Sequence, residues 1–326
     1  MRTLSVRIER FATRHPFVIA RGAKHHVDVV VVEVGEGGQV GRGEGTPLDY
    51  LGDTAEAAKA AILAQSDAVA AGATRADLLD CMRPGAARNA LDCAFWDLEA
   101  RQSGRRVWQI LGLPEPKPML TAFTISLGEP GAMEAAARAA AHRELLKVKL
   151  DGEGAIERLE AVRRGAPGAR LIVDANASWA GQDVERLAYA LFDLGVEFIE
   201  QPLPAGADAE LSHVRSPVPL CADESCHDRA SLDEVIGRYR MINIKLDKAG
   251  GLTEALALVH AARIRGLGIM TGCMLSTSLG VAPAFHLAMH ASHADLDGPI
   301  LLASDRPHGL RFEGSDIHPP RQDLWG

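Results

Sequence analysis

Short apolar segments recur from residue 120 onward, and each ends on or beside a polar residue. Helical stretches separate them, among them Met133–His142, Ala155–Arg164, Asp183–Leu194 and Leu252–Arg265. Strands that alternate with helices predict a parallel sheet, and eight strands predict its closure into a barrel. The predicted strands are Leu120–Leu127, Leu145–Leu150, Ala169–Asp174, Val196–Glu200, Val218–Asp223, Met241–Lys245, Leu267–Thr271 and Ala294–Asp297.

The polar residues at the strand ends are spaced like the units of such a barrel. From the second strand to the sixth they follow one another at intervals of 22 to 26 residues, about the length of one strand–loop–helix–loop unit. Because the chemistry of these barrels lies at the C-terminal ends of the strands, the spacing also predicts where the site is. The eight strand ends are Thr124, Lys149, Asp174, Glu200, Asp223, Lys245, the Thr271–Met274 stretch and Asp297.

The first 115 residues do not follow this spacing. Val27–Val34 is predicted to be a buried strand that turns into a second strand near Val40, and helices are predicted at Thr54–Ala71 and Ala86–Arg101. The Pro-rich stretch Leu113–Pro118 is a predicted linker. We therefore predict an α/β chain with an α+β capping domain (1–115) and a modified TIM barrel of the type (β/α)7β (116–310). The tail 311–326 has no clear helix and is free to return to the capping domain.

Composition and charge narrow the classes of partner. The 326 residues are 47% hydrophobic with a formal net charge of −8, so a basic surface for nucleic acid is not expected. No apolar run approaches the roughly 20 residues of a membrane span, and the N-terminus lacks the apolar block of a signal peptide. Five cysteines without a CxxC pair suit a reduced cytoplasm. A small-molecule substrate is expected, and association into a homo-oligomer is left open.

Three carboxylates end consecutive predicted strands. Asp174, Glu200 and Asp223 would lie side by side around the ring, where their negative charges would repel one another. A hard divalent cation removes that repulsion, and Mg²⁺ prefers oxygen ligands, so one Mg²⁺ per chain is predicted. The alternative is that each acid caps the helix that follows its strand.

Two lysines lie on either side of the acids in this ring. Lys149 ends the second strand and Lys245 the sixth, so they face each other across the mouth of the barrel. Opposed lysines beside a metal suit removal of a proton from one face of a carbon and its return to the other, next to a carboxylate. The alternative is a pair of surface lysines, although apolar residues flank both.

These residues resemble the enolase superfamily, muconate-lactonizing subgroup. The resemblance rests on Lys147-Val-Lys149, Asp174-Ala-Asn176, Glu200-Gln-Pro202, Asp223-Glu-Ser225 and Asn243-Ile-Lys245, and it covers essentially the whole chain. Within the subgroup the match is closest to the dipeptide epimerases that act on L-Ala-D/L-Glu, a fragment of peptidoglycan. The resemblance implies an isomerase in which a Mg²⁺-stabilised enediolate forms between the two lysines, with Lys147 giving electrostatic support to the substrate carboxylate.

The residues that select the substrate are expected to lie outside the set of acids and lysines. Asp295 and Asp297 resemble the Asp-x-Asp motif by which dipeptide epimerases hold the free ammonium, although an Asp pair in a turn is the alternative. Arg21 and Lys24 lie where the capping loop of this family closes the site, and they could bind a glutamate side chain; Lys24 is also compatible with plain surface charge. Thr124 matches a substrate-contacting threonine of the family or is an ordinary strand residue.

Two other functions remain open at this point. A cycloisomerase or o-succinylbenzoate synthase of the same superfamily would share the metal and the lysines, but its substrate has no ammonium for Asp297. A non-catalytic ligand-binding barrel would not require two opposed bases.

Overall fold

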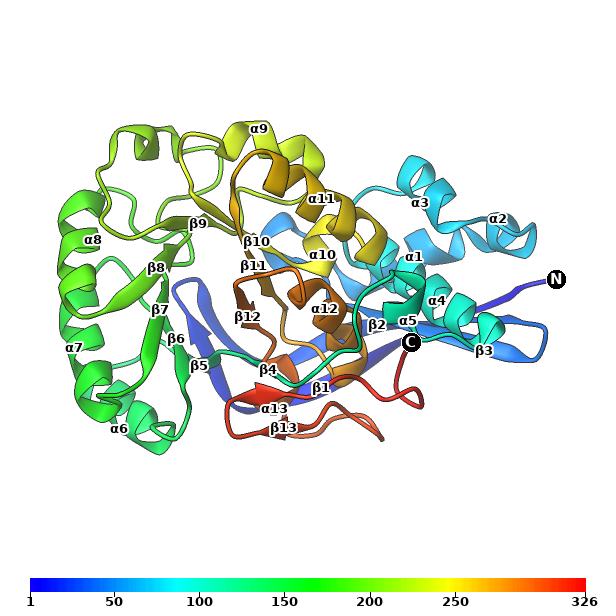
Figure 1. Ribbon diagram of the computed structural model, residues 1–326, viewed down its shortest axis with the longest axis horizontal. Coiled ribbons are helices and arrows are strands. Elements are labelled where there is room, and N and C mark those ends of the chain that lie inside the picture. The colour runs from blue at the N-terminus through cyan, green and yellow to red at the C-terminus, as the bar shows by residue number, and fades with distance from the viewer.

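The computed structural model describes residues 1–326 and consists of a capping domain beside a barrel (Figure 1). Three antiparallel strands in the order β1-β2-β3 form the capping sheet: β1 (Thr3–Ile19), β2 (Gly22–Glu36) and β3 (Gln39–Gly45). Its helices, preceded by the short 3-10 helix η1 (Asp49–Leu51), are α1 (Ala55–Leu63), α2 (Ser66–Ala70), α3 (Arg75–Cys81), α4 (Ala86–Ser103) and α5 (Val107–Ile110).

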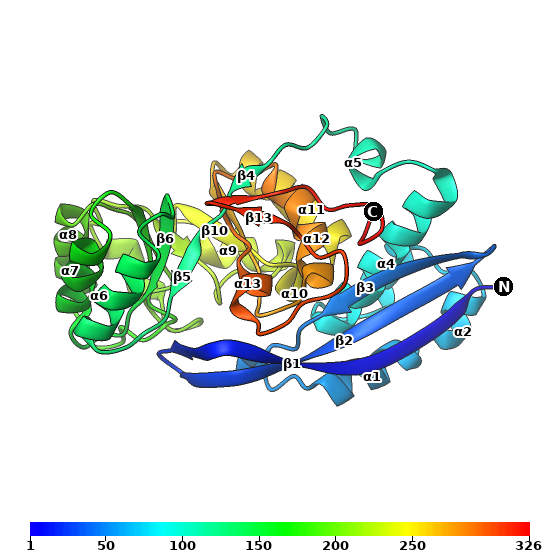
Figure 2. The same ribbon diagram turned by 90° about the horizontal axis from the view of Figure 1, so that it is seen from below.

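Two elements predicted for this domain differ in the structure, one helix and one loop. The single helix predicted over Thr54–Ala71 is two helices, α1 and α2, because the chain turns at Ala64 and Gln65, where the Gln65 N–H bonds to Ile62 O. The predicted polar loop before Val27 belongs to a long β1–β2 hairpin, which pairs as far as Ile19 with Gly22. In Figure 2 this hairpin runs from the capping domain along the barrel towards β5 (Phe123–Ile125).

Alternate glycines on β3 allow helix α4 to lie directly on the sheet. Gly41, Gly43 and Gly45 share one face of the strand, and a Cβ atom added to Gly43 would overlap the backbone of Ala90 on the helix. The backbones of β3 and α4 therefore lie closer together than they could if side chains stood between them. The glycines therefore set the distance between the capping sheet and its main helix.

We expect Gly43→Ala to lower the free energy of unfolding by roughly 1–3 kcal/mol, since the new methyl group must push α4 away. Urea-induced unfolding followed by circular dichroism measures the change. Gly131→Ala is the matched control, because Gly131 lies on a helix with open space around it and alanine favours helices. Equal stability of Gly43→Ala and the wild type would contradict the close packing.

Eight parallel strands form the barrel, as the sequence predicted. They run in the order β5 to β12, and Ala122 N–H donates to Ala294 O at 2.8 Å, which joins the two ends of the sheet. The strands after β5 are β6 (Leu145–Lys149), β7 (Arg170–Asp174), β8 (Val196–Glu200), β9 (Leu220–Ala222), β10 (Met241–Ile244), β11 (Gly268–Gly272) and β12 (His293–Asp295).

Helices cover the outside of the barrel between the strands (Figure 1). One connection, between β8 and β9, has only the 3-10 helix η2 (Ala209–His213), and the last strand is followed by one turn of helix instead of an eighth full helix. The helices are α6 (Pro130–Ala139), α7 (Ala155–Gly165), α8 (Val184–Asp193), α9 (Leu232–Val235) after η3 (Arg229–Ser231), α10 (Leu246–Ala249), α11 (Leu252–Ile264), α12 (Ser278–Ala288) and α13 (Gly298–Leu301). No helix has the length and apolar character needed to cross a membrane.

The first predicted barrel strand is shorter than expected because its N-terminal part pairs elsewhere. Within Leu120–Leu127 the barrel strand itself is Phe123–Ile125, and Ala122 adds the bond to Ala294 that closes the ring. The preceding β4 (Met119–Leu120) pairs instead with β14 (Asp316–Ile317) of the tail, and β14 pairs with β13 (Phe312–Glu313).

The end of the chain returns to α4 of the capping domain. Trp325 is fully buried and its indole N–H donates to Cys93 O at 3.1 Å. The Gly326 N–H donates to the Asp97 carboxylate at 2.8 Å. Figure 1 accordingly places the C-terminus beside α5.

Candidate active site

Three buried carboxylates meet at the C-terminal end of the barrel. Asp174 and Glu200 are the last residues of β7 and β8, and Asp223 follows β9 directly. All three are at most 3% exposed, and one oxygen atom of each lies within 4.8 Å of the others. Oxygen donors this close, on one side of a buried space, fit a hard divalent cation.

The two predicted bases lie on either side of these acids. Lys149 Nζ is 2.6 Å from Asp174 Oδ2, and Lys245 Nζ is 2.7 Å from Asp223 Oδ2. Lys149 ends β6 and Lys245 directly follows β10, and these two strands flank the three acid-bearing strands on either side. The structure therefore brings together the five residues at the centre of the predicted chemistry.

Lys147 lies beneath the acids, where it is 1% exposed. Its ammonium is 2.8 Å from both Glu200 and Asp295 and 3.2 Å from Asp174. Asp295 is thus an ion-pair partner of Lys147. This pairing was not expected from the Asp-x-Asp pattern, which gave both acids to a substrate ammonium.

Burial and nearby charges shift the pKa values of Asp174 and Glu200 in different directions. For Asp174, burial favours the neutral form, but the nearby Lys149 and Lys147 outweigh it and lower its pKa. For Glu200, burial and the charge of Asp174 together raise the pKa to about 7. A cation among the acids would favour the charged form of Glu200 as well.

Residues that had no predicted role hold the site in place. Lys248, on α10, forms a second ion pair with Asp223 at 2.6 Å, and its three-residue spacing from Lys245 was the available signal. Gln201 has a φ of 37°, an unfavourable value for a residue other than glycine. Its side-chain oxygen accepts N–H bonds from Asp223 at 2.8 Å and Ser225 at 3.1 Å, so it fixes the loop that carries an acid.

A cavity of about 470 Å³ is lined by Asp223 and by both lysines, Lys149 and Lys245, and its walls come from both domains. The β1–β2 hairpin and the loop after β3 form one side, and the ends of the barrel strands form the other. The lining residues are Phe17, Ile19, Arg21, Gly22, Ala23, Lys24, Thr46, Asp49, Tyr50, Lys149, Asn176, Asp223, Glu224, Lys245, Cys273, Met274 and Leu275.

Arg21 and Lys24 both line this cavity, at the tip of the hairpin. Arg21 Nη1 is 2.5 Å from Glu224 Oε1 and also donates to Asn176 O at 3.2 Å. Lys24 forms an ion pair with Asp49. Each cation therefore already has an acidic neighbour from another segment, which the sequence did not indicate.

Thr124 and Asp297 lie together but are not among the residues that line this cavity. The backbone N–H of Thr124 donates to Asp297 Oδ2 at 2.7 Å, and both residues are buried. Burial, with the nearby charge of Asp295, raises the pKa of Asp297 to about 7. Thr124 lines a neighbouring, more apolar hollow that shares Phe17 with the cavity.

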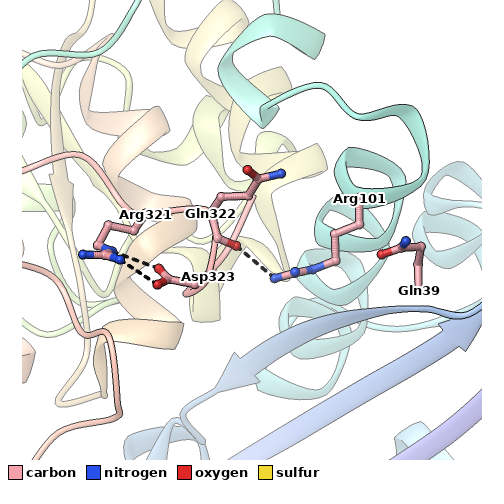
Figure 3. Close-up of a pocket in the computed structure, with 5 residues that line it drawn as sticks. All are labelled: Gln39, Arg101, Arg321, Gln322 and Asp323. Atoms are coloured by element: carbon pink, nitrogen blue, oxygen red, sulfur yellow. Dashed lines mark hydrogen bonds and ion pairs between the residues drawn. The ribbon is translucent and has the colours of Figure 1, made fainter.

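A separate hollow lies where the C-terminal tail meets the capping domain (Figure 3). Gln39, Arg101 and three tail residues surround it, and Arg101 donates to Gln322 O at 3.2 Å. Arg321 is paired with Asp323 at 2.8 Å. None of the predicted site residues lines it, and its polar groups serve the junction between tail and domain.

An eight-stranded barrel with acids on three consecutive strands and a lysine on each side places the protein among the enolase-type barrel enzymes. The chain belongs to the mandelate racemase / muconate lactonizing enzyme family. Residues 1–112 match the N-terminal domain of that family, and residues 132–321 match the enolase C-terminal domain-like family.

Similar proteins include several epimerases. The chain is 46% identical to the L-Ala-D/L-Glu epimerase of Escherichia coli, over 98% of this chain and all of that protein. It is 47% identical to an N-acetyl-D-glutamate racemase of a Pseudoalteromonas species, over 77% of this chain and 79% of that one. A crystal structure of an enolase family member from Agrobacterium tumefaciens, with homology to dipeptide epimerases and with bound sodium and L-Ala-L-Glu, matches with a TM-score of 0.98 and 49% identity over the whole of both chains.

A further crystal structure is that of the dipeptide epimerase of Enterococcus faecalis with Mg and L-Leu-L-Tyr. It has a TM-score of 0.90 and 29% identity, over 97% of this chain and 96% of that one. The resemblance to the enolase superfamily inferred from the strand-end motifs is confirmed by these matches.

Proposed function

We propose that the protein is a Mg²⁺-dependent dipeptide epimerase that inverts the α-carbon of the second residue of a dipeptide such as L-Ala-D/L-Glu. The observation that carries the proposal is the placement of Lys149 and Lys245 on opposite sides of the three acids. A catalyst that moves a proton from one face of a carbon to the other needs one such group on each face. The epimerases among its relatives support the choice of a dipeptide.

Asp174, Glu200 and Asp223 would hold the metal. When bound, Mg²⁺ supplies a positive charge that favours the enediolate form of the substrate's terminal carboxylate. Lys149 or Lys245, whichever is neutral, takes the α-proton from its own side, and the protonated lysine opposite returns a proton to the other face. Lys147, which contacts Glu200 and Asp174, contributes positive charge below the carboxylate-binding region.

The ends of the dipeptide are assigned to different segments. Arg21 and Lys24 would bind the glutamate side chain, because they are the cations of the capping-domain wall of the cavity. Asp297 would hold the free ammonium, and the backbone N–H of Thr124 would keep the Asp297 carboxylate in position by its hydrogen bond. Asp295 would act mainly through Lys147, its ion-pair partner.

We further propose that the enzyme works in the cytoplasm on peptides released from peptidoglycan, as the family resemblance suggests, and a homo-oligomer is compatible with this role. A second candidate is racemisation of an N-acylated glutamate, which the 47% identical relative favours. Both reactions use the same lysines and metal. They differ in whether the amine is free, and hence in the need for Asp297.

A panel of L-Ala-L-Xaa dipeptides and N-acetyl-L-glutamate, incubated with Mg²⁺ in deuterated water, tests the proposal. Mass spectrometry detects replacement of the α-proton by deuterium. Incorporation into L-Ala-L-Glu supports dipeptide epimerisation, and incorporation into N-acetyl-glutamate alone supports the second candidate. A dicarboxylate that contains no nitrogen is tested beside the panel. Its turnover alone would indicate a cycloisomerase-type reaction, and no reaction with any of these compounds would indicate a binding protein.

We expect Asp297→Asn to raise KM for L-Ala-L-Glu by about tenfold or more, because the charged partner of the ammonium is lost.

The KM of the wild type should likewise rise at low pH. Its Asp297 has a pKa of about 7, so it loses its negative charge as the pH falls through 7, and KM should rise. In Asp297→Asn this rise should be absent. The check is to measure KM for the wild type and for Asp297→Asn between pH 6 and pH 8, in steps of about half a pH unit. Unchanged KM in Asp297→Asn would contradict the ammonium assignment.

A further inference from the structure

Tyr50 presents a buried hydroxyl group without a partner at the cavity. It lies in η1, in the loop between β3 and α1, and is one of the lining residues. Its phenolic oxygen is buried and makes no hydrogen bond within the protein. Burial holds the pKa of Tyr50 well above its usual range, so the group stays protonated and can donate. Buried donors in native proteins nearly always have an acceptor, and a ligand in the cavity that Tyr50 lines would supply one here.

The neighbours of Tyr50 indicate which ligand group that is. The guanidinium carbon of Arg21 lies 5.3 Å from the centre of the Tyr50 ring, so the ring supports the cation that faces the cavity. Lys24 is held beside the same loop by Asp49, the residue before Tyr50. Glu224 and Asn176 occupy only Nη1 of Arg21, so the other N–H groups of this guanidinium face no acceptor in the protein. Together with the neutral donor of Tyr50 they fit a carboxylate, which accepts several hydrogen bonds at once.

This wall belongs to the capping domain, whereas the acids and lysines of the proposed chemistry belong to the barrel. A dipeptide that ends in glutamate has two carboxylates, one at the reacting end and one on the side chain. Since the reacting end belongs at the barrel, the side-chain carboxylate is the group left for the capping wall.

We propose that the Tyr50 hydroxyl donates a hydrogen bond to the side-chain carboxylate of the substrate's second residue and so selects acidic dipeptides. The assignment rests on the proposed epimerase function and adds to it a specificity residue of the capping domain. Arg21 supplies charge, and Tyr50 supplies a directed donor that an apolar side chain would leave unpaired.

Tyr50→Phe is the direct test, since it removes only the hydroxyl and keeps the ring against Arg21. KM for L-Ala-L-Glu is expected to rise by about tenfold, with kcat changed by less than about twofold, as suits loss of one hydrogen bond to a charged group. For L-Ala-L-Met, which offers no carboxylate on its side chain, kcat/KM should change by less than about twofold. Where L-Ala-L-Met is not turned over, its inhibition constant against L-Ala-L-Glu gives the same comparison.

The other two tyrosines are matched controls. Tyr189 is exposed on α8, and Tyr189→Phe should leave both dipeptides unaffected. The Tyr239 hydroxyl bonds to Asp208 at 2.7 Å, and Tyr239 does not line the cavity, so Tyr239→Phe should lower stability without altering the preference between dipeptides.

Two results would overturn the assignment: unchanged KM in Tyr50→Phe, or an equal loss for L-Ala-L-Glu and L-Ala-L-Met. The second would place the hydroxyl at the terminal carboxylate, which both substrates share. Failure of the wild type to exchange the α-proton of any dipeptide contradicts the proposed function instead. Calorimetric binding of L-Ala-L-Glu to wild type and Tyr50→Phe then decides whether Tyr50 contacts the ligand.

Discussion

Replacing Lys149 by alanine is expected to abolish epimerisation of L-Ala-L-Glu, with a loss in kcat of about 10²- to 10⁴-fold or more, the usual contribution of one acid–base group. Lys245→Ala should lose epimerisation to the same extent. The physical reason is that inversion needs a proton donor or acceptor on each face, and each variant retains only one. Formation of the opposite stereoisomer, followed by chiral chromatography or circular dichroism, measures the loss.

The two variants should differ in the proton exchange that survives. With one lysine left, a substrate whose α-proton points to that lysine can still lose it and regain a deuteron on the same face. Each variant should therefore exchange the α-proton of a single stereoisomer in deuterated water, and the two variants should prefer opposite stereoisomers. Lys117→Ala, at an exposed position in the linker, is the matched control and should retain full activity. Full epimerase activity in either active-site variant would rule out the two-base scheme.

Folding must be checked in the same variants, because both lysines are ion-paired. Removal of Lys149 leaves Asp174 with Lys147 at 3.2 Å, so this acid keeps one cationic partner. Asp223 likewise keeps Lys248 when Lys245 is removed. Each buried acid retains a countercharge, and thermal unfolding should still be cooperative.

Removal of the metal is expected to eliminate activity without unfolding the protein. Chelation with EDTA, followed by dialysis, should reduce turnover to background, and Mg²⁺ should restore it. The protein should stay folded because Lys147, Lys149 and Lys245 pair with the three acids when no cation is bound. Added Mg²⁺ at about 100 times its dissociation constant should raise the free energy of unfolding by about 2.7 kcal/mol.

Glu200→Gln is the matched variant for this test, since it keeps the shape of the side chain and removes one negative charge. It should need much more Mg²⁺ for activity and gain less thermal stability from it. Glu313→Gln, in the tail, should behave as the wild type, because its side chain is 70% exposed. Activity that persists after exhaustive chelation would contradict a metal-dependent reaction.

The strand ends could be predicted because their polar residues interrupt apolar runs at a regular interval. Val196–Glu200 was predicted without error, and the other barrel strands within a few residues. Helix α12 gave no usable pattern, since nearly all of its residues are buried and Pro283 lies inside it. A helix that is apolar on every side has no polar face to mark its period.

Ion pairs between distant segments could not be predicted from the sequence. The partner of Asp295 is Lys147, 148 residues away, and the partner of Arg21 is Glu224, 203 residues away. Sequence spacing places a side chain at an edge of the barrel but does not determine which of several nearby charges it meets. Tyr50 had no signal at all, because a single aromatic residue in a loop becomes informative only when its buried hydroxyl is seen to lack a partner.

The return of the tail to α4 also affects the order in which the protein can fold during its synthesis. The capping domain is synthesised first, yet Trp325 and Gly326, which follow Cys93 and Asp97 by 232 and 229 residues, complete the surroundings of those two residues. Trp325 and Gly326 are still within the ribosome while the barrel emerges. Final packing of the first domain therefore has to wait until the tail has left the ribosome, and a chain that stops before Trp325 lacks these contacts.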